Sequence, residues 1–268
     1  VAPGVHWMRM PLPFALDHIN LWLLEDGDQW VIVDCGIGNE ATLGLWQEII
    51  DNCMGGRSVS RVIATHHHPD HTSGDLAMAK LGATLFSRDE LRAHLASGNN
   101  PTPAAGLPVV TYSGASKTTL HMNGEEIQLI PVLNAHTDGD TMVYFTKANV
   151  LMVGDFYRSI QYPNVDRNNG GSVKGVIAAY DQVLALTKPT TKIVAGHGPV
   201  VDKTAIQANK ELIITIRDRV QALINQGKSQ DEVIAAKPLA DLDAKVQQVG
   251  TTGDRFLGQV YAELKAGK

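Results

Sequence analysis

Short runs of apolar residues recur along the chain and alternate with longer segments in which apolar residues return every three or four positions. The short runs are rich in Val, Ile and Leu and are bounded by turn-forming residues, a pattern typical of β-strands. They predict strands over residues 18–24, 30–34, 59–65, 118–121, 126–133, 141–146 and 149–153. The longer period predicts helices over residues 39–52, 71–81, 91–96, 172–186, 204–224, 230–237 and 254–264.

Strands in runs, broken by helices on both sides, are typical of an α+β fold with two sheets packed face to face and helices outside. The candidate ligands described below span residues 66–197, so the part of the chain that holds them must fold as one unit. We therefore expect a single domain over residues 1–268. Within it, residues 203–268 form a helical C-terminal extension, which we expect to cap one sheet; a lid and a dimer contact are the alternatives.

Composition narrows the class of protein. Hydrophobic residues make up 44% of the chain and charged residues 19%, as in an ordinary soluble globular protein. A net charge of −5 argues against a nucleic-acid partner, and no apolar stretch approaches the ~20 residues that cross a bilayer. We expect a small-molecule substrate, no nucleic acid and no membrane; the oligomeric state, monomer or homodimer, stays open.

The strongest chemical signal is a histidine run directly after the predicted strand 59–65. It has the pattern His-x-His-x-Asp-His, with imidazoles at His66, His68 and His71 and a carboxylate at Asp70. Two imidazoles one residue apart can close on one ion, while the adjacent Asp-His pair can point at a second. Imidazole together with carboxylate suits zinc, iron or manganese better than calcium or magnesium.

The run Lys192-Ile193-Val194 predicts one further strand. Three further candidates, His136, Asp155 and His197, each follow a predicted strand at the point where the chain turns. Loops positioned by a rigid sheet commonly carry binding and catalytic groups. Taken singly, Asp155 could be a turn residue or helix N-cap, and His197 a hydrogen-bonded turn histidine. Their shared position after strands favours metal ligands.

The order of these motifs resembles the metallo-β-lactamase superfamily over roughly residues 5–200. The resemblance rests on Val33-Asp34-Cys35-Gly36, the histidine run, His136, Gly154-Asp155 and Gly196-His197-Gly198-Pro199. It implies an αββα sandwich with the site at one edge between the sheets. It also implies two Zn²⁺ ions per chain, with Fe or Mn as alternatives. One ion would be held by His66, His68 and His136, the other by Asp70, His71 and His197, with Asp155 bridging them. His67 fills a variable position and is not expected to be a ligand.

Many β-lactamases of this fold have Cys or Ser where this chain has Asp155, whereas an Asp there resembles glyoxalase II-like thioesterases, lactonases and related esterases. We therefore expect a hydrolase that attacks an ester, lactone, thioester or β-lactam with a metal-bridging hydroxide. Two ions can lower the pKa of a shared water from about 15.7 toward ~7. Asp70 or Asp155 could then pass a proton to the leaving group. The alternatives are a mononuclear iron oxygenase resembling persulfide dioxygenases and a phosphodiesterase of the same fold.

Residues around the ligands give weaker signals. Asp34 is expected to orient a ligating histidine through its second ring nitrogen. Tyr157, Arg158 and Tyr162 follow the bridging Asp and are candidate substrate contacts, with a packed loop as the alternative. Arg158 stands where similar lactonases have Tyr, and the tail shows no counterpart of the glutathione-binding region of glyoxalase II. Both departures weaken a strict assignment to either branch.

Two segments resemble different subgroups of the superfamily. Residues 11–36 resemble one subgroup, whereas residues 107–171 resemble another whose members often carry export signals. A natural mosaic and an engineered chimera both fit this pattern. The second resemblance favours a periplasmic or secreted location over a cytoplasmic one.

Overall fold

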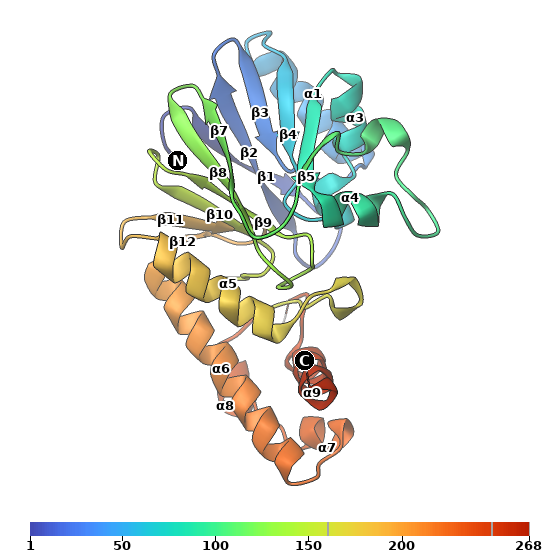
Figure 1. Cartoon of the computed structure of the whole chain (residues 1–268), viewed down its shortest axis with the longest axis vertical. Coiled ribbons are helices and arrows are strands. Elements are labelled where there is room, and N and C mark those ends of the chain that lie inside the picture. The colour runs from blue at the N-terminus through green and yellow to red at the C-terminus, as the bar shows by residue number, and fades with distance from the viewer. Residues whose placement is uncertain (160, 248, 268) are drawn as a thin grey trace.

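The computed structural model describes residues 1–159, 161–247 and 249–267, and shows two β-sheets packed face to face with helices outside (Figure 1). Sheet A contains, in spatial order, β1 (Val5–Pro11), β2 (His18–Asp26), β3 (Gln29–Val33), β4 (Val59–Ile63), β5 (Thr84–Arg88) and β6 (Val110–Tyr112). Sheet B contains, in spatial order, β12 (Val200–Val201), β11 (Lys192–Ala195), β10 (Val150–Gly154), β9 (Thr141–Phe145), β8 (Glu125–Pro131) and β7 (Thr118–Met122). Both sheets mix parallel and antiparallel pairs, so the predicted α+β sandwich is confirmed.

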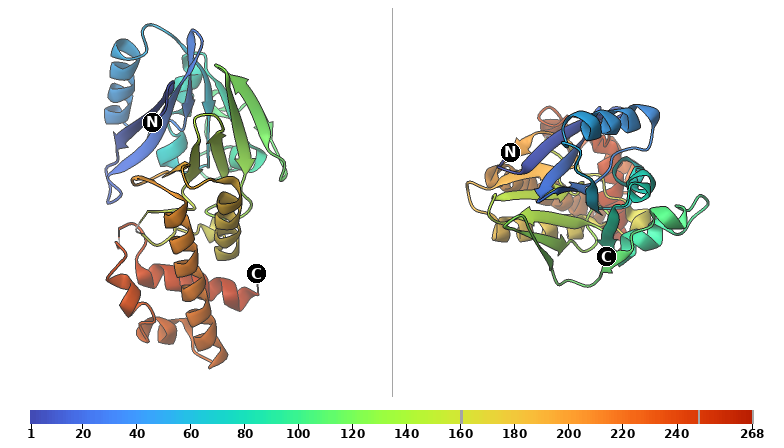
Figure 2. Two further views of the ribbon diagram at one scale, coloured as in Figure 1. Left: turned by 90° about the vertical axis from the view of Figure 1, so that its left-hand side faces the viewer. Right: turned by 90° about the horizontal axis from the view of Figure 1, so that it is seen from above.

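The helices fall into two sets. Those connecting strands of sheet A are α1 (Glu40–Asn52), α2 (Pro69–Thr72), α3 (Asp75–Lys80), α4 (Asp89–Leu95) and the 3-10 turn η1 (Ala104–Gly106). The second half contains η2 (Arg167–Asn169), α5 (Val173–Leu186), α6 (Lys203–Asn225), α7 (Gln230–Ala235), α8 (Ala240–Asp243) and α9 (Gly253–Ala266). Figure 2 shows α5 and the helices after it gathered at one end of the molecule, beyond the sandwich.

Strand β2 shows how the sandwich is built. Its residues Leu21 and Leu23 pack in the cluster between sheet A and its helices, whereas Trp22 and Leu24 pack between the two sheets. The strand is therefore buried on both faces, which explains why it reads as a continuous apolar run rather than an alternating one.

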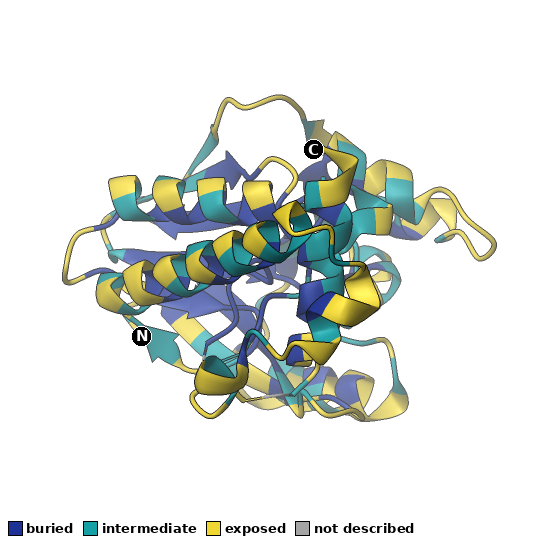
Figure 3. Cartoon of the chain, turned by 90° about the horizontal axis from the view of Figure 1, so that it is seen from below, coloured by how far each residue is buried: buried dark blue, intermediate teal, exposed yellow. Residues whose placement is uncertain are grey.

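The C-terminal helices share a hydrophobic core with sheet B. Ile213 of α6 and Phe256 of α9 belong to the same buried cluster as Leu151 of β10, with α5 between them. Seen from the helical end, the helices turn buried faces inward and exposed faces outward (Figure 3). We infer that the described residues between 203 and 267 fold on the sandwich as part of the same domain. No helix among the described residues is long and apolar enough to cross a membrane.

The predicted helix over residues 71–81 is wrong in one respect, because the chain forms α2 and α3 with a break between them. The break lies at Gly74, where an added Cβ would lie 2.7 Å from the Cβ of Cys35. In addition, the backbone N–H of Cys35 donates to the carbonyl of His71 at 2.8 Å. Because the chain packs this closely against the residues that follow β3, α2 ends before α3 begins, and His71 lies in the short helix α2.

Candidate metal centre

The histidine run lies where the chain leaves β4 and enters α2. His68 has extended backbone angles (φ −64°, ψ 148°), and Pro69 starts the helical turn, a position for which its fixed φ is suited. His66 therefore precedes the bend, whereas Asp70 and His71 follow it. The bend lets side chains from both of its arms face the same space.

The remaining candidates lie in loops that follow β8, β10 and β11. Asp140 shapes the turn that carries His136, because its Oδ2 accepts the backbone N–H of His136 at 2.7 Å. Asp155 directly follows β10, and its Oδ1 would lie only 2.0 Å from a Cβ added to Gly196. Glycine at position 196 therefore lets this carboxylate lie against the loop that continues into His197.

The structure brings all seven predicted ligand residues together. The three-histidine group contains His66, His68 and His136, and the mixed group contains Asp70, His71 and His197. Within each group the ligand atoms lie within 4.8 Å of one another. Asp155 contacts both groups: its Oδ1 lies 3.4 Å from His71 Nε2. Its Oδ2 lies 3.2 Å from His197 Nε2 and 4.0 Å from His136 Nε2.

Several buried polar atoms at this point have no hydrogen-bond partner among the described residues. They are His66 Nε2, His71 Nε2, His197 Nε2 and Asp155 Oδ1. An unpaired buried polar atom is costly in a folded protein, so a convergent set of them needs a ligand. Nitrogen and carboxylate donors with this arrangement fit divalent metal ions of the zinc type.

The mixed group is oriented by residues of sheet A. His71 Nδ1 lies 2.8 Å from Asp34 Oδ2, which leaves Nε2 free for a metal. Asp34 is itself fixed by Thr65, whose backbone N–H and hydroxyl donate to its two oxygens at 2.8 and 2.7 Å. His197 Nδ1 lies 2.7 Å from the carbonyl oxygen of His18. Asp34 thus has the contact expected of a residue that orients a ligand.

The three-histidine group is oriented by a loop after β10. His136 Nδ1 lies 2.6 Å from the carbonyl oxygen of Asn164, and His68 Nε2 lies 2.9 Å from Asp166 Oδ2. The other nitrogen of His68, Nδ1, faces His136 Nε2 at 2.9 Å. Sequence analysis missed Asn164 and Asp166, since neither shows a motif or spacing that connects it to the histidines.

The two groups differ in charge. Burial lowers the pKa of His66 well below its usual value, and it lowers the pKa of His136 to about 3. Burial also opposes protonation in the mixed group, but there the neighbouring carboxylates outweigh it. They raise the pKa of His71 well above its usual value and that of His197 to about 9.

The carboxylates respond in the opposite sense. Burial alone would raise the pKa of Asp70 and Asp155, yet the facing histidines lower the first to about 2 and the second well below its usual value. Both carboxyl groups are therefore ionised at neutral pH, the form in which they ligate a metal.

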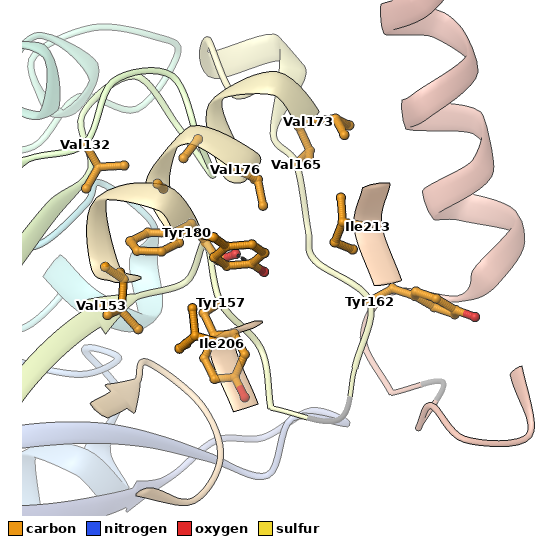
Figure 4. Close-up of a cluster of buried hydrophobic side chains, with 14 of the residues drawn as sticks. Val132, Val153, Tyr157, Tyr162, Val165, Val173, Val176, Tyr180, Ile206 and Ile213 are labelled. Atoms are coloured by element: carbon orange, nitrogen blue, oxygen red, sulfur yellow. Dashed lines mark hydrogen bonds between the residues drawn. The ribbon is translucent and has the colours of Figure 1, made fainter. Parts of the chain in front are cut away.

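The two candidate tyrosines lie in packed surroundings. Tyr157 belongs to the hydrophobic cluster beneath α5, with its ring 6.2 Å from that of Tyr180 (Figure 4). The Tyr162 hydroxyl donates to Asp243 at 2.7 Å, and its ring stacks on Phe256 at 5.7 Å. Neither tyrosine contacts any of the seven candidate ligands in the described structure. These contacts agree with the packed loop named as the alternative, and a substrate contact for either tyrosine stays a prediction.

Arg158 lies closer to the centre than the tyrosines. Its guanidinium is buried, and Nη2 lies 3.2 Å from Asp155 Oδ2. This contact places Arg158 beside the carboxylate of Asp155. His67 stacks on His94, with ring centroids 4.3 Å apart, and its ring also lies 4.8 Å from that of His68.

Two clefts open on either side of His68 and Asp166. One, of about 700 Å³, is also lined by His67, His94 and the loop around Pro101. The other, of about 620 Å³, runs toward α7 and α9. Both volumes are in the range of small-molecule sites.

The sequence can now be compared with known proteins. The family model described as "Metallo-beta-lactamase superfamily" matches residues 15–197. The chain belongs to the metallo-β-lactamase superfamily. The predicted membership and the predicted metal-dependent hydrolase are thereby confirmed.

Three curated relatives have different activities in their names. The chain is 25% identical to a metallo-beta-lactamase type 2 from Elizabethkingia meningoseptica, over 72% of this chain and 74% of the relative. It is 27% identical to a hydroxyacylglutathione hydrolase from Nitrosococcus oceani, over 66% of this chain and 61% of the relative. It is 25% identical to an atrochrysone carboxyl ACP thioesterase from Pseudocercospora fijiensis, over 85% of this chain and 69% of the relative.

The fold extends the likeness to the whole chain. A metallo-beta-lactamase family protein from Thermus thermophilus superposes with a TM-score of 0.74 at 19% identity. The superposition covers 99% of this chain and 94% of that one. The C-terminal helices are therefore included in the shared architecture, beyond the segment that the family model matches.

Proposed function

We propose that this chain is a hydrolase with two Zn²⁺ ions, which cleaves an acyl bond of a small-molecule substrate. The observation that carries the proposal is the position of Asp155, whose two oxygens face histidines of both groups. One carboxylate can therefore be shared by two ions. The three-histidine group would hold one ion and the mixed group the other, and the donor set favours zinc over iron or manganese.

Two zinc ions bound here would lower the pKa of a shared water toward neutrality and polarise the scissile carbonyl. The protein's own residues hold the ligands in place through the second nitrogen of each oriented imidazole. The side chain of Asp70 is 16% exposed, against 2% for Asp155. Asp70 is thus the carboxylate that can take a proton from the attacking water and pass it to the leaving group.

Within this class we place thioesters first, followed by esters and lactones, with β-lactams last. Two of the three relatives described are named as an ACP thioesterase and as a hydroxyacylglutathione hydrolase. The Asp at position 155 adds support, because it resembles the glyoxalase II-like thioesterases rather than β-lactamases with Cys or Ser there. Leaving-group chemistry supports the same order. A thiolate leaves with little help from an acid because a thiol has a pKa of about 8.5, whereas the amine of a β-lactam must be protonated as it leaves.

The test combines elemental analysis of the purified protein with hydrolysis of an acyl thioester, a lactone and a cephalosporin. We expect close to two zinc ions per chain, loss of turnover on chelation, and recovery when zinc is returned. Relative kcat/KM values should then rank the thioester first. One iron per chain without hydrolysis of any of the three would contradict the proposal and indicate the oxygenase alternative.

A further inference from the structure

The loop that orients the three-histidine group is short and central. From residues 164–166 it presents the carbonyl oxygen of Asn164 to His136 Nδ1 at 2.6 Å and the carboxylate of Asp166 to His68 Nε2 at 2.9 Å. The backbone N–H of Asp166 also donates to the carbonyl of His136 at 2.9 Å. A shift of this loop would therefore move two of the three imidazoles at once.

The middle residue of the loop is held from the C-terminal helix. Gln259 of α9 donates from Nε2 to the carbonyl oxygen of Val165 at 2.9 Å, and its Oε1 accepts the Val165 backbone N–H at 3.4 Å. One side-chain amide thus pairs with both backbone groups of Val165, although 94 residues separate them. Since Val165 lies between Asn164 and Asp166, this pairing fixes the position of both.

The helix that carries Gln259 is itself firmly anchored. Phe256 and Val260, on the same helix, are completely buried in the hydrophobic cluster under sheet B. One turn further on, the carboxylate of Glu263 accepts the backbone N–H groups of Val173 and Lys174 at the start of α5. Gln259 is therefore a rigid support rather than a free surface side chain.

The mixed group has different supports. Asp34, Thr65 and the carbonyl of His18 orient its histidines, and all three lie at the ends of strands of sheet A. No hydrogen bond between α9 and these three residues occurs in the described structure. A change in α9 should consequently act on one group and spare the other.

We propose that Gln259 is a positioning residue that sets the zinc affinity of the three-histidine group by holding the loop 164–166. The inference rests on the proposed two-zinc function and makes the C-terminal helices part of the metal centre's support. Residues that hydrogen-bond directly to metal ligands typically change metal affinity by about 10- to 100-fold when mutated. Gln259 contacts the loop and not a ligand, so we expect its loss to weaken zinc affinity by about tenfold, the lower end of that range.

The experiment measures zinc binding to metal-free protein by competition with a coloured chelator, together with thermal unfolding. Gln259→Leu removes both hydrogen bonds while keeping a side chain of similar size. This variant should bind one of the two zinc ions about tenfold more weakly and the other with wild-type affinity. Gln259→Ala carries the same test if the leucine variant does not fold.

A matched control lies in the same cleft. Gln230 at the start of α7 also lines the cleft of about 620 Å³, and its side chain makes no hydrogen bond among the described residues. Gln230→Leu makes the same chemical change there and should leave both zinc affinities unchanged.

The outcomes separate the two proposals. If the wild type binds two ions and Gln259→Leu binds both equally well, the positioning role is overturned while the dinuclear site stands. Equal weakening of both ions with a lower melting temperature would also overturn it, because that result indicates general destabilisation. A wild-type protein that binds no zinc would overturn the proposed function and the positioning role together.

Discussion

The three-histidine group and the mixed group both face Asp155, yet the pKa values of His66 and His136 in the first are lowered, whereas those of His71 and His197 in the second are raised. In the first, burial keeps the pKa of His136 near 3, so the ring is neutral at pH 7. In the second, Asp155 and Asp70 outweigh burial and raise the pKa of His197 to about 9. A histidine is therefore neutral, as a metal ligand must be, where burial dominates, and protonated where carboxylates face it. If two ions bind here as proposed, they should accordingly differ in affinity.

The change with the largest expected effect removes what the two groups share. Asp155→Ala should lower kcat about a thousandfold and reduce bound zinc, because both groups lose their common carboxylate. Elemental analysis and turnover of the purified variant check this. Asp51→Ala, at an exposed position on α1, is the control and should match the wild type. Wild-type metal content and turnover in Asp155→Ala would contradict the bridging role.

A second change displaces Asp155 without altering any ligand. A methyl group at position 196 would lie 2.0 Å from Asp155 Oδ1 and 3.1 Å from His71 Cε1, so Gly196→Ala should lower kcat about a hundredfold. Gly44→Ala is the control, since nothing lies within 4 Å of an added Cβ there. In a helix that substitution should raise the free energy of unfolding by about 0.5–1 kcal/mol. Equal kinetics of the two variants would contradict the close approach.

Two variants test the two groups separately, because different residues orient the histidines of each group. Asp34→Ala frees His71 and should weaken zinc at the mixed group about tenfold, whereas Asp166→Ala frees His68 and should do so at the three-histidine group. Stepwise zinc titration of each metal-free variant measures which of the two affinities falls. If both variants lowered the affinity for the same ion, the proposed division of the ligands between the two groups would be incorrect.

The smallest expected effect lies outside both groups. Tyr162→Phe removes the hydrogen bond to Asp243 and should lower the free energy of unfolding by about 1 kcal/mol. Because the hydroxyl contacts no candidate ligand in the described structure, kcat/KM should stay at the wild-type value. Urea unfolding and steady-state kinetics check the two parts. A tenfold loss of kcat/KM with unchanged stability would restore Tyr162 as a substrate contact.

The convergence of the seven candidate ligands was predictable because each stands beside a strong local signal. The histidine run is contiguous, and His136, Asp155 and His197 each follow a strongly apolar strand. Their supports carry no such signal: 98 residues separate Asp166 from His68, and the contact exists only after the chain has folded. Local sequence patterns predict the candidate ligands, but they do not predict the residues that tertiary packing places beside them.

The fold shows the same division. The fully buried strand β10 was predicted. Three strands of sheet A, β1, β5 and β6, were missed: β1 and β6 lie at its edges, and β5, between β4 and β6, mixes buried with half-buried side chains. Tyr157 was a candidate substrate contact because it follows Asp155, and its side chain packs in the hydrophobic cluster. The periplasmic or secreted location and the choice between monomer and homodimer stay predictions.

The ligands of each group come from both sheets, and this has a consequence for folding. The histidine run follows β4 of sheet A, whereas His136 and His197 follow β8 and β11 of sheet B. An ion in either group would therefore tie the two layers together across a long stretch of chain, as a removable cross-link. Such a link stabilises the folded state in proportion to RT ln(1 + [Zn]/Kd), so the supply of zinc would govern how long the molecule survives as well as how fast it turns over.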